Sequence, residues 1–285
     1  MPPMHSTGTA LDADWLGACR AAASGLRAIL RAAPATRERA VETGERGEGG
    51  DRTLVIDQAA EDAVFAQLER LRAEGHRFTA VSEERGEVDF GGGSVRVVID
   101  PIDGSLNAKR LLPSCALSIA VADGPTMADV AFGYVLDFGT GEEWSATRGG
   151  GARLDGVALD PRLPERRGRS GRLEVLGLEQ ADPRWLAPVA GALEQETERL
   201  RVLGSIALTI CQVGAARIDA MLSLRRCRGV DAAAAQLIAR EAGALVAFPG
   251  GGDGPLAVPL DVVAHAPIVC ARSPETLAAL SRLTA

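Results

Sequence analysis

The chain has 285 residues, of which 46% are hydrophobic and 24% charged; these values are typical of a globular protein and exclude the disordered and fibrous classes. Its length allows one large domain or two of ordinary size, with a core that needs no disulfide or metal to support it. A net charge of −7, from 31 Lys and Arg against 38 Asp and Glu, argues against nucleic acid as the main partner, because such binding depends on clustered Lys and Arg.

The first part of the chain predicts two helices followed by a series of strands. Apolar residues recur with the period of a helix over residues 11–33 and again over residues 57–72. Between them, residues 36–52 are polar and glycine-rich, and we expect a mobile loop there. Short apolar or alternating runs then predict β-strands at residues 77–82, 95–99, 116–122, 129–137 and 142–146.

The second part alternates strand and helix. The Gly-, Pro- and Arg-rich stretch 149–172 is the best candidate for a boundary, so we expect one half over residues 1–150 and another over residues 151–285. Strands are predicted at residues 173–178, 201–203, 218–222, 244–248 and 268–271, and helices at 185–196, 205–215, 231–242 and 274–283. This order of elements predicts a layered α/β protein.

Several features bear on compartment and covalent chemistry. The five cysteines are widely spaced, without a C-x-x-C pair, so we expect buried small side chains and neither a disulfide framework nor a zinc site. The first residues, MPPMHSTGTA, lack the pattern of a signal peptide. The longest apolar run, residues 116–122, is too short to span a bilayer. We therefore expect a soluble, cytoplasmic protein without a membrane partner.

The most informative segment is D-P-I-D-G-S at residues 100–105, where an apolar run ends in two acids. Pro101 and Gly104 are expected to force a turn that directs Asp100 and Asp103 to one point. Two carboxylates about 4 Å apart repel by roughly 4 kcal/mol at an effective dielectric constant near 20. Either one of them takes up a proton or a cation lies between them, and Mg²⁺ prefers such oxygen ligands. The alternative is a plain turn in which both acids accept backbone N–H groups.

Other acids favour the metal site over the plain turn. Glu83 and Glu84 follow a predicted strand, and Asp57 and Asp231 each stand at the start of a predicted helix. Taken singly, the two glutamates are typical of solvated loop charges and the two aspartates of N-caps. Together they form an all-oxygen set, without His or Cys nearby, that suits Mg²⁺.

The sequence resembles the inositol monophosphatase superfamily of Mg²⁺-dependent, lithium-sensitive phosphatases. D-P-I-D-G-S-L-N resembles the first signature of the family, and V-D-A-A-A-A-Q-L-I-A-R-E-A-G-A resembles the second. R-V-L-G-S-I-A-L, G-A-A-R-I-D-A and V-S-E-E resemble three further blocks, and all the matches run in family order between Asp51 and Phe248. The resemblance implies an αβαβα sandwich, commonly dimeric, so we expect a homodimer.

The resemblance also implies roles for individual residues. It implies that the metal ligands are Glu83, Asp100, the Ile102 carbonyl, Asp103 and Asp231. Two or three Mg²⁺ ions per site are expected, with Mn²⁺ as a substitute. Asp57 and Ser105 would position the attacking water. The backbone of Gly104 and Ser105 would bind the phosphate, and Gly204 and Ser205 would line the sugar or polyol side. One metal would lower the pKa of a bound water, and a second would stabilise the leaving alkoxide.

The substrate is expected to be a small phosphorylated metabolite, and one departure from the family bears on its identity. Leu224 stands where inositol-specific members carry a Glu that binds substrate hydroxyls, so inositol is in doubt. Nearby, Arg225, Arg226 and Arg228 form either a solvated surface turn or a clamp for a second anionic group. Fructose-1,6-bisphosphate, a nucleotide bisphosphate and histidinol phosphate are the alternative substrates. A catalytically silent, metal-dependent interaction protein is the alternative from another functional class.

Overall fold

The helices mostly follow the predicted pattern. Residues 10–48 and 52–284 are described in the computed structural model. Its α-helices are α1 (Trp15–Ala32), α2 (Thr36–Arg39), α3 (Val55–Ala73), α4 (Ser105–Arg110), α5 (Pro183–Glu196), α6 (Ile206–Gly214), α7 (Gly229–Glu241) and α8 (Pro274–Ser281). Short 3₁₀ turns, η1 (Ala10–Asp12) and η2 (Met127–Asp129), precede α1 and β7 (Val130–Asp137).

The strands form two large sheets and two small pairs. The first sheet has the order β10-β9-β8-β7-β6-β5-β3-β4, and the second has the order β12-β11-β13-β17-β15. The first consists of β3 (Thr79–Ser82), β4 (Gly86–Asp89), β5 (Arg96–Asp103), β6 (Ala116–Ala122), β7, β8 (Glu143–Thr147), β9 (Gly151–Leu154) and β10 (Val157–Ala158). The second consists of β11 (Leu176–Glu179), β12 (Leu200–Arg201), β13 (Ala220–Ser223), β15 (Leu245–Ala247) and β17 (Val269–Ala271). The pairs are β1 (Glu42–Arg46) with β2 (Arg52–Leu54), and β14 (Cys227–Arg228) with β16 (Ala264–Ala266).

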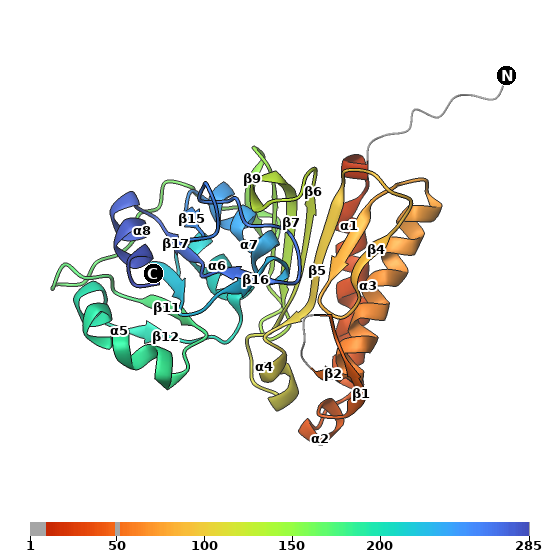
Figure 1. The fold of residues 1–285 in the computed structure, drawn as a ribbon, viewed down its shortest axis with the longest axis horizontal. Coiled ribbons are helices and arrows are strands. Elements are labelled where there is room, and N and C mark those ends of the chain that lie inside the picture. The colour runs from red at the N-terminus through yellow and green to blue at the C-terminus, as the bar shows by residue number, and fades with distance from the viewer. Residues whose placement is uncertain (1–9, 49–51, 285) are drawn as a thin grey trace.

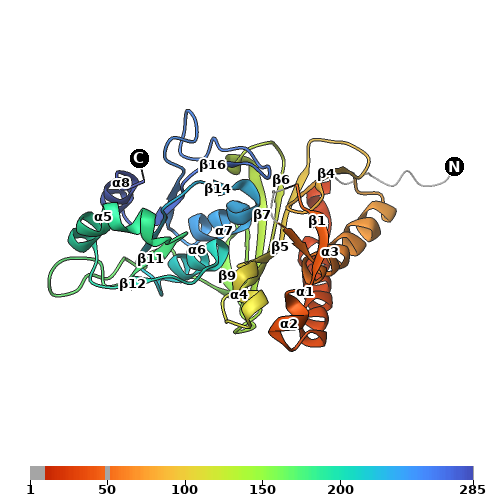
Figure 2. The ribbon, with the colours of Figure 1, turned by 60° about the horizontal axis from the view of Figure 1, so that its bottom comes forward.

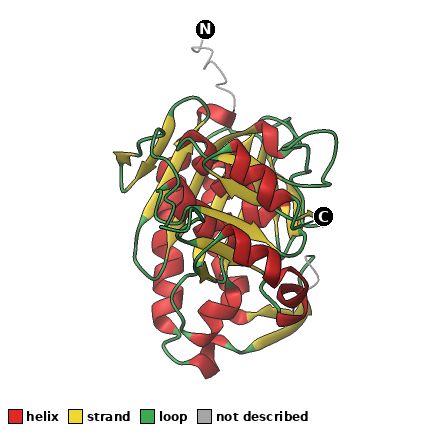
Figure 3. Cartoon of the chain, turned by 90° about the vertical axis from the view of Figure 1, so that its left-hand side faces the viewer, coloured by secondary structure: helices red, strands yellow, loops and turns green. Residues whose placement is uncertain are grey.

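Helices and sheets alternate in layers (Figure 1). Helices α1 and α3 pack on one face of the first sheet, and α6 and α7 lie between the two sheets (Figure 2). Helices α5 and α8 cover the far face of the second sheet, so helices stand in front of strands when the molecule is viewed from that side (Figure 3). The fold is the expected αβαβα sandwich.

The outer helix α1 shows why the periodic pattern forms this layer. Its apolar stripe, which includes Cys19, Ala22 and Leu26, is buried against α3 and the first sheet. Asp14 caps the helix by accepting the Gly17 N–H at 2.9 Å, so α1 begins at Trp15 and not at residue 11 as predicted. This apolar layer holds α3, and with it Asp57, against the first sheet.

Helix α7 packs unusually close to β7. A Cβ atom on Gly133 would lie 2.7 Å from the Ala234 carbonyl oxygen, so only glycine leaves room for the helix there. Nearly all of α7 is buried, which agrees with its alanine-rich sequence. The close approach sets the distance between α7 and the first sheet. It therefore also sets the position of Asp231, which lies near the N-terminus of α7.

The prediction for residues 36–52 is wrong in its described part. Residues 36–39 form α2, and β1 pairs antiparallel with β2. Residues 49–51, also within the predicted loop, lie outside the described residues. The short elements β4, α4, β10 and β14 were not predicted, and β9 and β10 occupy the start of the predicted boundary stretch. Two to six residues are too few to show a period, so their pairing partners define them.

The five cysteine side chains are buried with free thiols, as the sequence predicts. Among the described residues, no helix is both long and apolar enough to cross a bilayer.

Candidate active site

The two acids of the D-P-I-D-G-S segment lie on a β-bulge, not in the predicted turn. Strand β5 continues to Asp103, and its register against β6 shifts between Asp100 and Asp103. Asp100 pairs with Ser118 and Asp103 with Ala116, so an interval of three residues on β5 lies opposite an interval of two residues on β6. Residues three apart on a regular strand point to opposite faces, and the extra residue of a bulge brings them to the same face. The bulge therefore presents both carboxylates to one site.

Glu83 joins Asp100 through the parallel pairing of β3 and β5. Ser82, the last residue of β3, is in register with Ile99 of β5, so the next residues of the two strands are neighbours. Asp100 accepts the Ile102 N–H at 3.0 Å, which orients its carboxylate within the bulge.

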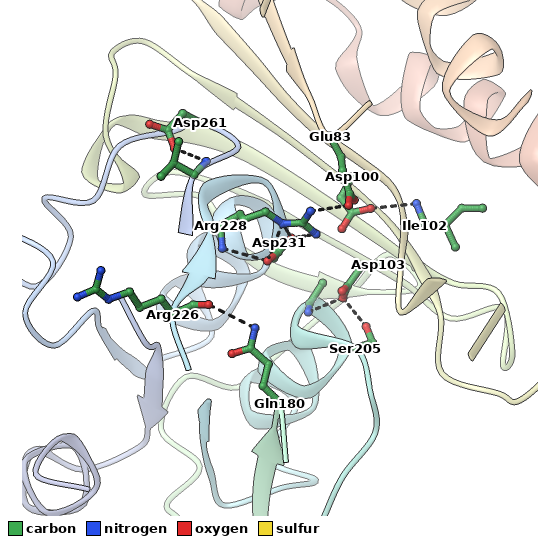
Figure 4. A network of polar contacts seen from close by, with 12 residues as sticks. Glu83, Asp100, Ile102, Asp103, Gln180, Ser205, Arg226, Arg228, Asp231 and Asp261 are labelled. Carbon is green, nitrogen blue, oxygen red and sulfur yellow. Dashed lines mark hydrogen bonds and ion pairs between the residues drawn. The ribbon is translucent and has the colours of Figure 1, made fainter. Parts of the chain in front are cut away.

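Helix α7 brings Asp231 to the same place from the second half of the chain. Asp231 is the third residue of α7 and accepts the Arg228 backbone N–H at 3.0 Å. The Arg228 guanidinium lies between two acids, 2.5 Å from Glu83 and 3.0 Å from Asp231 (Figure 4). Arg228 is therefore the arginine of the 225–228 cluster that enters the site.

Asp103 is fixed by groups at the start of α6. Its Oδ2 accepts the Ser205 hydroxyl at 2.5 Å and the Ala207 N–H at 2.7 Å (Figure 4). Ser205 caps α6 by accepting the Leu208 N–H. Gly204 stands close by, since a Cβ on Gly104 (φ +84°) would lie 2.9 Å from the Gly204 carbonyl oxygen. The predicted residue Ser205 thus contacts the Asp103 carboxylate directly, and Gly204 lies beside Gly104.

Two adjoining cavities open over these carboxylates. The first, of about 270 Å³, is lined by Asp57, Glu84, Lys109 and the hairpin residues Glu42 and Leu54, among others. The second, of about 240 Å³, is lined by Asp103, Gly104, Gly204, Arg228 and Asp231, among others. Glu83, Asp100, Ile102 and Ser105 line both.

Asp57 does not occupy the N-cap position of α3 that its place in the sequence is typical of. It is the third residue of α3, and its Oδ2 accepts the Leu54 N–H at a long 3.4 Å. Its Oδ1 is buried and has no hydrogen-bond partner among the described residues. An acceptor that is buried without a donor is costly, and a donor from a bound water or ligand would remove that cost.

Arg225 and Arg226 do not line either cavity as placed. The Arg225 guanidinium lies 5.2 Å from the centre of the Trp185 ring. The Arg226 side chain extends away from the carboxylates, and its carbonyl oxygen accepts from Gln180 (Figure 4). Leu224 packs against the apolar core between the second sheet and its outer helices.

Two polar residues of the second cavity, Glu179 and Gln180, and the apolar Ile206 were not predicted from the sequence. Glu179 ends β11 and is buried, where it accepts the Thr209 hydroxyl at 2.6 Å and the Leu203 and Gly204 N–H groups at 3.1 Å. An acid at the end of an apolar strand is the sequence signal at Asp100, and Glu179 carries the same signal. For Gln180 the sequence carries no signal.

The carboxylates share a strongly acidic environment. Burial, together with repulsion from Glu83 and Asp103, raises the pKa of Asp100 well above its ordinary value. Burial and then the charge of Asp231 raise the pKa of Asp103 to about 7, against the hydrogen bonds from Ser205 and Ala207. Burial and the charge of Glu84 raise the pKa of Asp57 to about 7. Each carboxylate would ionise more readily beside added positive charge.

The donor set fits a hard divalent cation. Every candidate ligand is an oxygen, several acids face one arginine, and the Asp57 Oδ1 has no donor. In the part of the chain that the structure describes, no three acid, His or Cys side chains converge as tightly as metal ligands do. Arg228 instead pairs with both Glu83 and Asp231.

Proteins of known sequence are similar to this chain. A model of the inositol monophosphatase family matches residues 13–284. A fructose-1,6-bisphosphatase/inositol-1-monophosphatase of Methanothermobacter thermautotrophicus is 33% identical over 227 residues, which cover 76% of this chain and 78% of the relative. The Nus factor SuhB of Escherichia coli K12 is 34% identical over 217 residues, covering 74% and 77%.

Solved structures show the same fold. An inositol monophosphatase–fructose 1,6-bisphosphatase has a TM-score of 0.79 at 24% identity, covering 95% of this chain and 100% of that one. The extragenic suppressor protein SuhB of Bartonella henselae has a TM-score of 0.75 at 23% identity, covering 95% and 98%. The family match over nearly the whole chain, together with the identity to these relatives, places the protein: the chain belongs to the inositol monophosphatase family.

Proposed function

We propose that this protein is a Mg²⁺-dependent phosphomonoesterase that hydrolyses a small sugar or polyol phosphate. The observation that carries the proposal is the meeting of Glu83, Asp100, Asp103 and Asp231 at one cavity, from β5, the end of β3 and the start of α7. Membership of a phosphatase family supports the same reaction class.

The proposed ligands are these four carboxylates and the Ile102 carbonyl, with two or three Mg²⁺ ions per site and Mn²⁺ as a substitute. When bound, the metal would supply positive charge that activates water and stabilises the leaving oxygen. Ser205 and the Ala207 N–H hold the Asp103 carboxylate in place through Oδ2. Arg228 would have to release Glu83 or Asp231 as the site fills, because both acids are its partners.

The proposed catalytic groups lie beside the ligands. Glu83 serves as a ligand at the reacting centre. Asp57 lines the first cavity and its buried Oδ1 lacks a donor, so its carboxylate is suited to accept a proton from the attacking water, with Ser105 orienting that water. The backbone of Gly104 and Ser105 would contact the phosphate, and Gly204 and Ser205 the alcohol side.

The name of one relative bears on which phosphate ester is the substrate. The relative from Methanothermobacter is named for both fructose-1,6-bisphosphate and inositol-1-phosphate hydrolysis, which supports a sugar or polyol ester. A nucleotide bisphosphate or histidinol phosphate is the alternative, with Arg225 and Arg226 binding a second anionic group of a long substrate. We further propose that the protein acts as a cytoplasmic homodimer without a membrane partner. We also propose that it has no nucleic-acid partner, which its net charge of −7 supports.

One observation favours a second candidate function from another class. The Escherichia coli relative is named a Nus factor, and it is as similar to this chain as the phosphatase relative is. A catalytically silent interaction protein would bind Mg²⁺ or a partner and release no phosphate from any ester.

The test is phosphate release with and without Mg²⁺ from inositol-1-phosphate, fructose-1,6-bisphosphate, a 3′,5′-bisphosphate nucleotide and histidinol phosphate. Asp103→Asn is expected to lower kcat by at least about 100-fold, the loss typical when one electrostatic stabiliser is removed. Asp253→Asn, at an exposed position away from both cavities, is the matched control and should turn over normally. Near-normal turnover of Asp103→Asn would refute the site, and no turnover of any ester by the unmodified protein would favour the interaction protein.

A further inference from the structure

A third cavity lies at the end of the first sheet where β7 ends and β6 begins. It measures about 720 Å³, which is larger than either of the first two cavities and within the usual range for a small-molecule site. Its walls come from the C-terminal end of α1, from α2, from the loop after α4 and from the turn between β7 and β8. Helices α2 and α4 lie side by side there (Figures 1 and 2). Among the described residues, none lines both this cavity and one of the first two.

The third cavity is lined by three arginines, Arg27, Arg31 and Arg39, and by no acid in the part of the chain that the structure describes. This is the opposite of the whole chain, in which acids outnumber Lys and Arg. The hydrogen bonds of Arg27 and Arg39 there go to backbone carbonyl oxygens, which carry no net charge. Glu143, which lines an adjoining cavity with Arg27, is already paired with Arg20 at 2.7 Å. The third cavity therefore has positive charge that its own lining does not compensate.

Arg39 holds part of this charge in a fixed place. Its guanidinium donates to the carbonyl oxygens of Leu30, Ala33 and Ala108, each at 2.8 Å, and so connects the end of α1 to α4. A guanidinium has more N–H donors than these three bonds use, so Arg39 keeps donors for a further acceptor. The dipole of α1 favours cations at this end of the helix, but it does not require them to line a cavity.

Arg27 and Arg31 lie about one turn apart on α1, so their side chains are neighbours on the helix surface. Like charges at this spacing repel, and an anion held between them would remove the repulsion. Arg27 is half-buried, and its hydrogen bond to the Gly141 carbonyl oxygen is a long 3.2 Å. A guanidinium makes shorter and stronger hydrogen bonds to phosphate or carboxylate oxygens. The two arginines are thus placed to bind an anionic group.

The remaining walls of the third cavity are apolar. Leu111 and Leu112 follow α4, and they are 44% and 52% exposed. Leu111 has a φ of +58°, in the left-handed region that a leucine rarely adopts, so the loop keeps these side chains at the cavity at a cost in backbone energy. Phe138 and Pro113 complete this wall. A ligand that covers the wall therefore needs an apolar body as well as a charge.

We propose that the third cavity binds a small organic anion in which a phosphate or carboxylate group is joined to an apolar body. Arg27 and Arg31 bind the anionic group, and Leu111, Leu112 and Phe138 cover the apolar body. A second copy of the chain fits this face less well, because a twofold contact through it would bring its arginines towards those of the other copy. The site is separate from the proposed phosphatase chemistry and does not depend on it.

The test is calorimetric binding of phenylphosphonate and benzoate in EDTA, where the acids of the first two cavities disfavour an anion. The better of these two probes identifies the anionic group. It should bind at least about tenfold more tightly than methylphosphonate, which lacks the ring, and benzyl alcohol, which lacks the charge. Arg27→Gln and Arg31→Gln should each weaken its binding at least about tenfold, the effect of one charge-assisted hydrogen bond. Arg282→Gln is the matched control, because Arg282 is also exposed at the C-terminal end of a helix, and it should leave binding unchanged.

A further variant, Leu112→Ser, keeps all three arginines and tests the apolar wall. It should weaken the binding of phenylphosphonate and leave that of methylphosphonate unchanged. The inference is overturned if neither aromatic anion binds, if both arginine variants bind them normally, or if benzyl alcohol binds as tightly as they do. A dimer that binds no probe and that Leu112→Ser converts to monomers in sedimentation would show that a second copy covers this face instead. None of these results depends on phosphate release, so the phosphatase stands or fails by its own test.

Discussion

Arg228 is the residue that most changes the electrostatics of the site. It lines the second cavity with five carboxylates, those of Glu83, Asp100, Asp103, Glu179 and Asp231. Its guanidinium pairs with two of them, Glu83 and Asp231, and its own side chain is only 20% exposed. A partly buried cation among several acids compensates charge that would otherwise be costly, and the same placement makes it a competitor for any cation that enters.

Replacing Arg228 with Met should therefore have two opposite effects. Without metal, the free energy of unfolding should fall by about 3 kcal/mol, because Glu83 and Asp231 lose their partner in a partly buried place. Mg²⁺ should bind at least about tenfold more tightly, since a nearby positive charge no longer repels it. Chemical denaturation in EDTA and calorimetric Mg²⁺ titration measure the two effects. Arg169→Met, at an exposed position, is the control. Weaker Mg²⁺ binding in Arg228→Met would contradict this account.

The site could be predicted from the sequence only where acids follow or precede a recognisable element. Asp100, Asp103 and Asp231 meet as the motifs indicate. The entry of Arg228 and the exclusion of Arg226 could not be predicted, because the two residues are only two apart and their directions depend on the β14–β16 pairing. Gln180 was missed because its place at the second cavity leaves no trace in composition or period.

At the scale of elements, the spacing between α7 and the first sheet controls where Asp231 lies. Gly133 of β7 meets the backbone of Ala234, which follows Asp231 by nearly one helical turn. The strand was predicted from its alternating pattern, and the helix from its alanine-rich run. The contact between β7 and α7 was not predicted. The sequence does not show which element packs against Gly133, so it does not show why a side chain must be absent there.

Gly133→Ala should push α7 away from the sheet. The added Cβ would lie 2.7 Å from the Ala234 carbonyl oxygen and 3.2 Å from its Cα, and neither backbone can move cheaply. We expect a loss of about 1–3 kcal/mol in the free energy of unfolding, typical of an overpacked core, and weaker Mg²⁺ binding as Asp231 shifts. Thermal melting and Mg²⁺ titration measure both. Gly191→Ala, where a Cβ on α5 meets nothing within 4 Å, should instead be neutral or slightly stabilising. Equal melting temperatures for the two variants would rule out the spacing argument.

At the scale of the whole molecule, the layered architecture was predictable and the division of the chain at residue 150 stays a prediction. Strong periods identified α1 and α3, an alanine-rich run α7 and an apolar run β6, and the order of these elements is enough to predict alternating layers. The layers in turn bury acids that come from both sheets and from α3. Asp57, Glu61, Asp103 and Glu179 each have a pKa raised to about 7, in every case chiefly by burial.

The metal-free protein should consequently lose stability as the pH rises from about 5 to about 7.5. Between the ordinary pKa of these carboxyls, near 4, and the raised value of about 7, the folded state binds more protons than the unfolded state. Their contribution is fully present below the ordinary pKa and is lost as the pH passes through the raised one. Urea denaturation in EDTA at several pH values measures the slope.

Adding Mg²⁺ and replacing Glu61 distinguish which carboxyl groups cause this pH dependence of the free energy of unfolding. Mg²⁺ should stabilise the protein more at pH 7.5 than at pH 5.5, because the ligands must release their protons to bind it. Glu61→Gln should reduce the slope without metal, since Glu61 is buried beside Ser82 and Arg85 and lines neither cavity. That variant should leave the Mg²⁺ effect intact, because its proton is not displaced by the ion. Stability that stays constant over this range in EDTA would show that the buried acids ionise in the folded protein at their ordinary pKa, and stability that rises with pH would show that folding lowers their pKa.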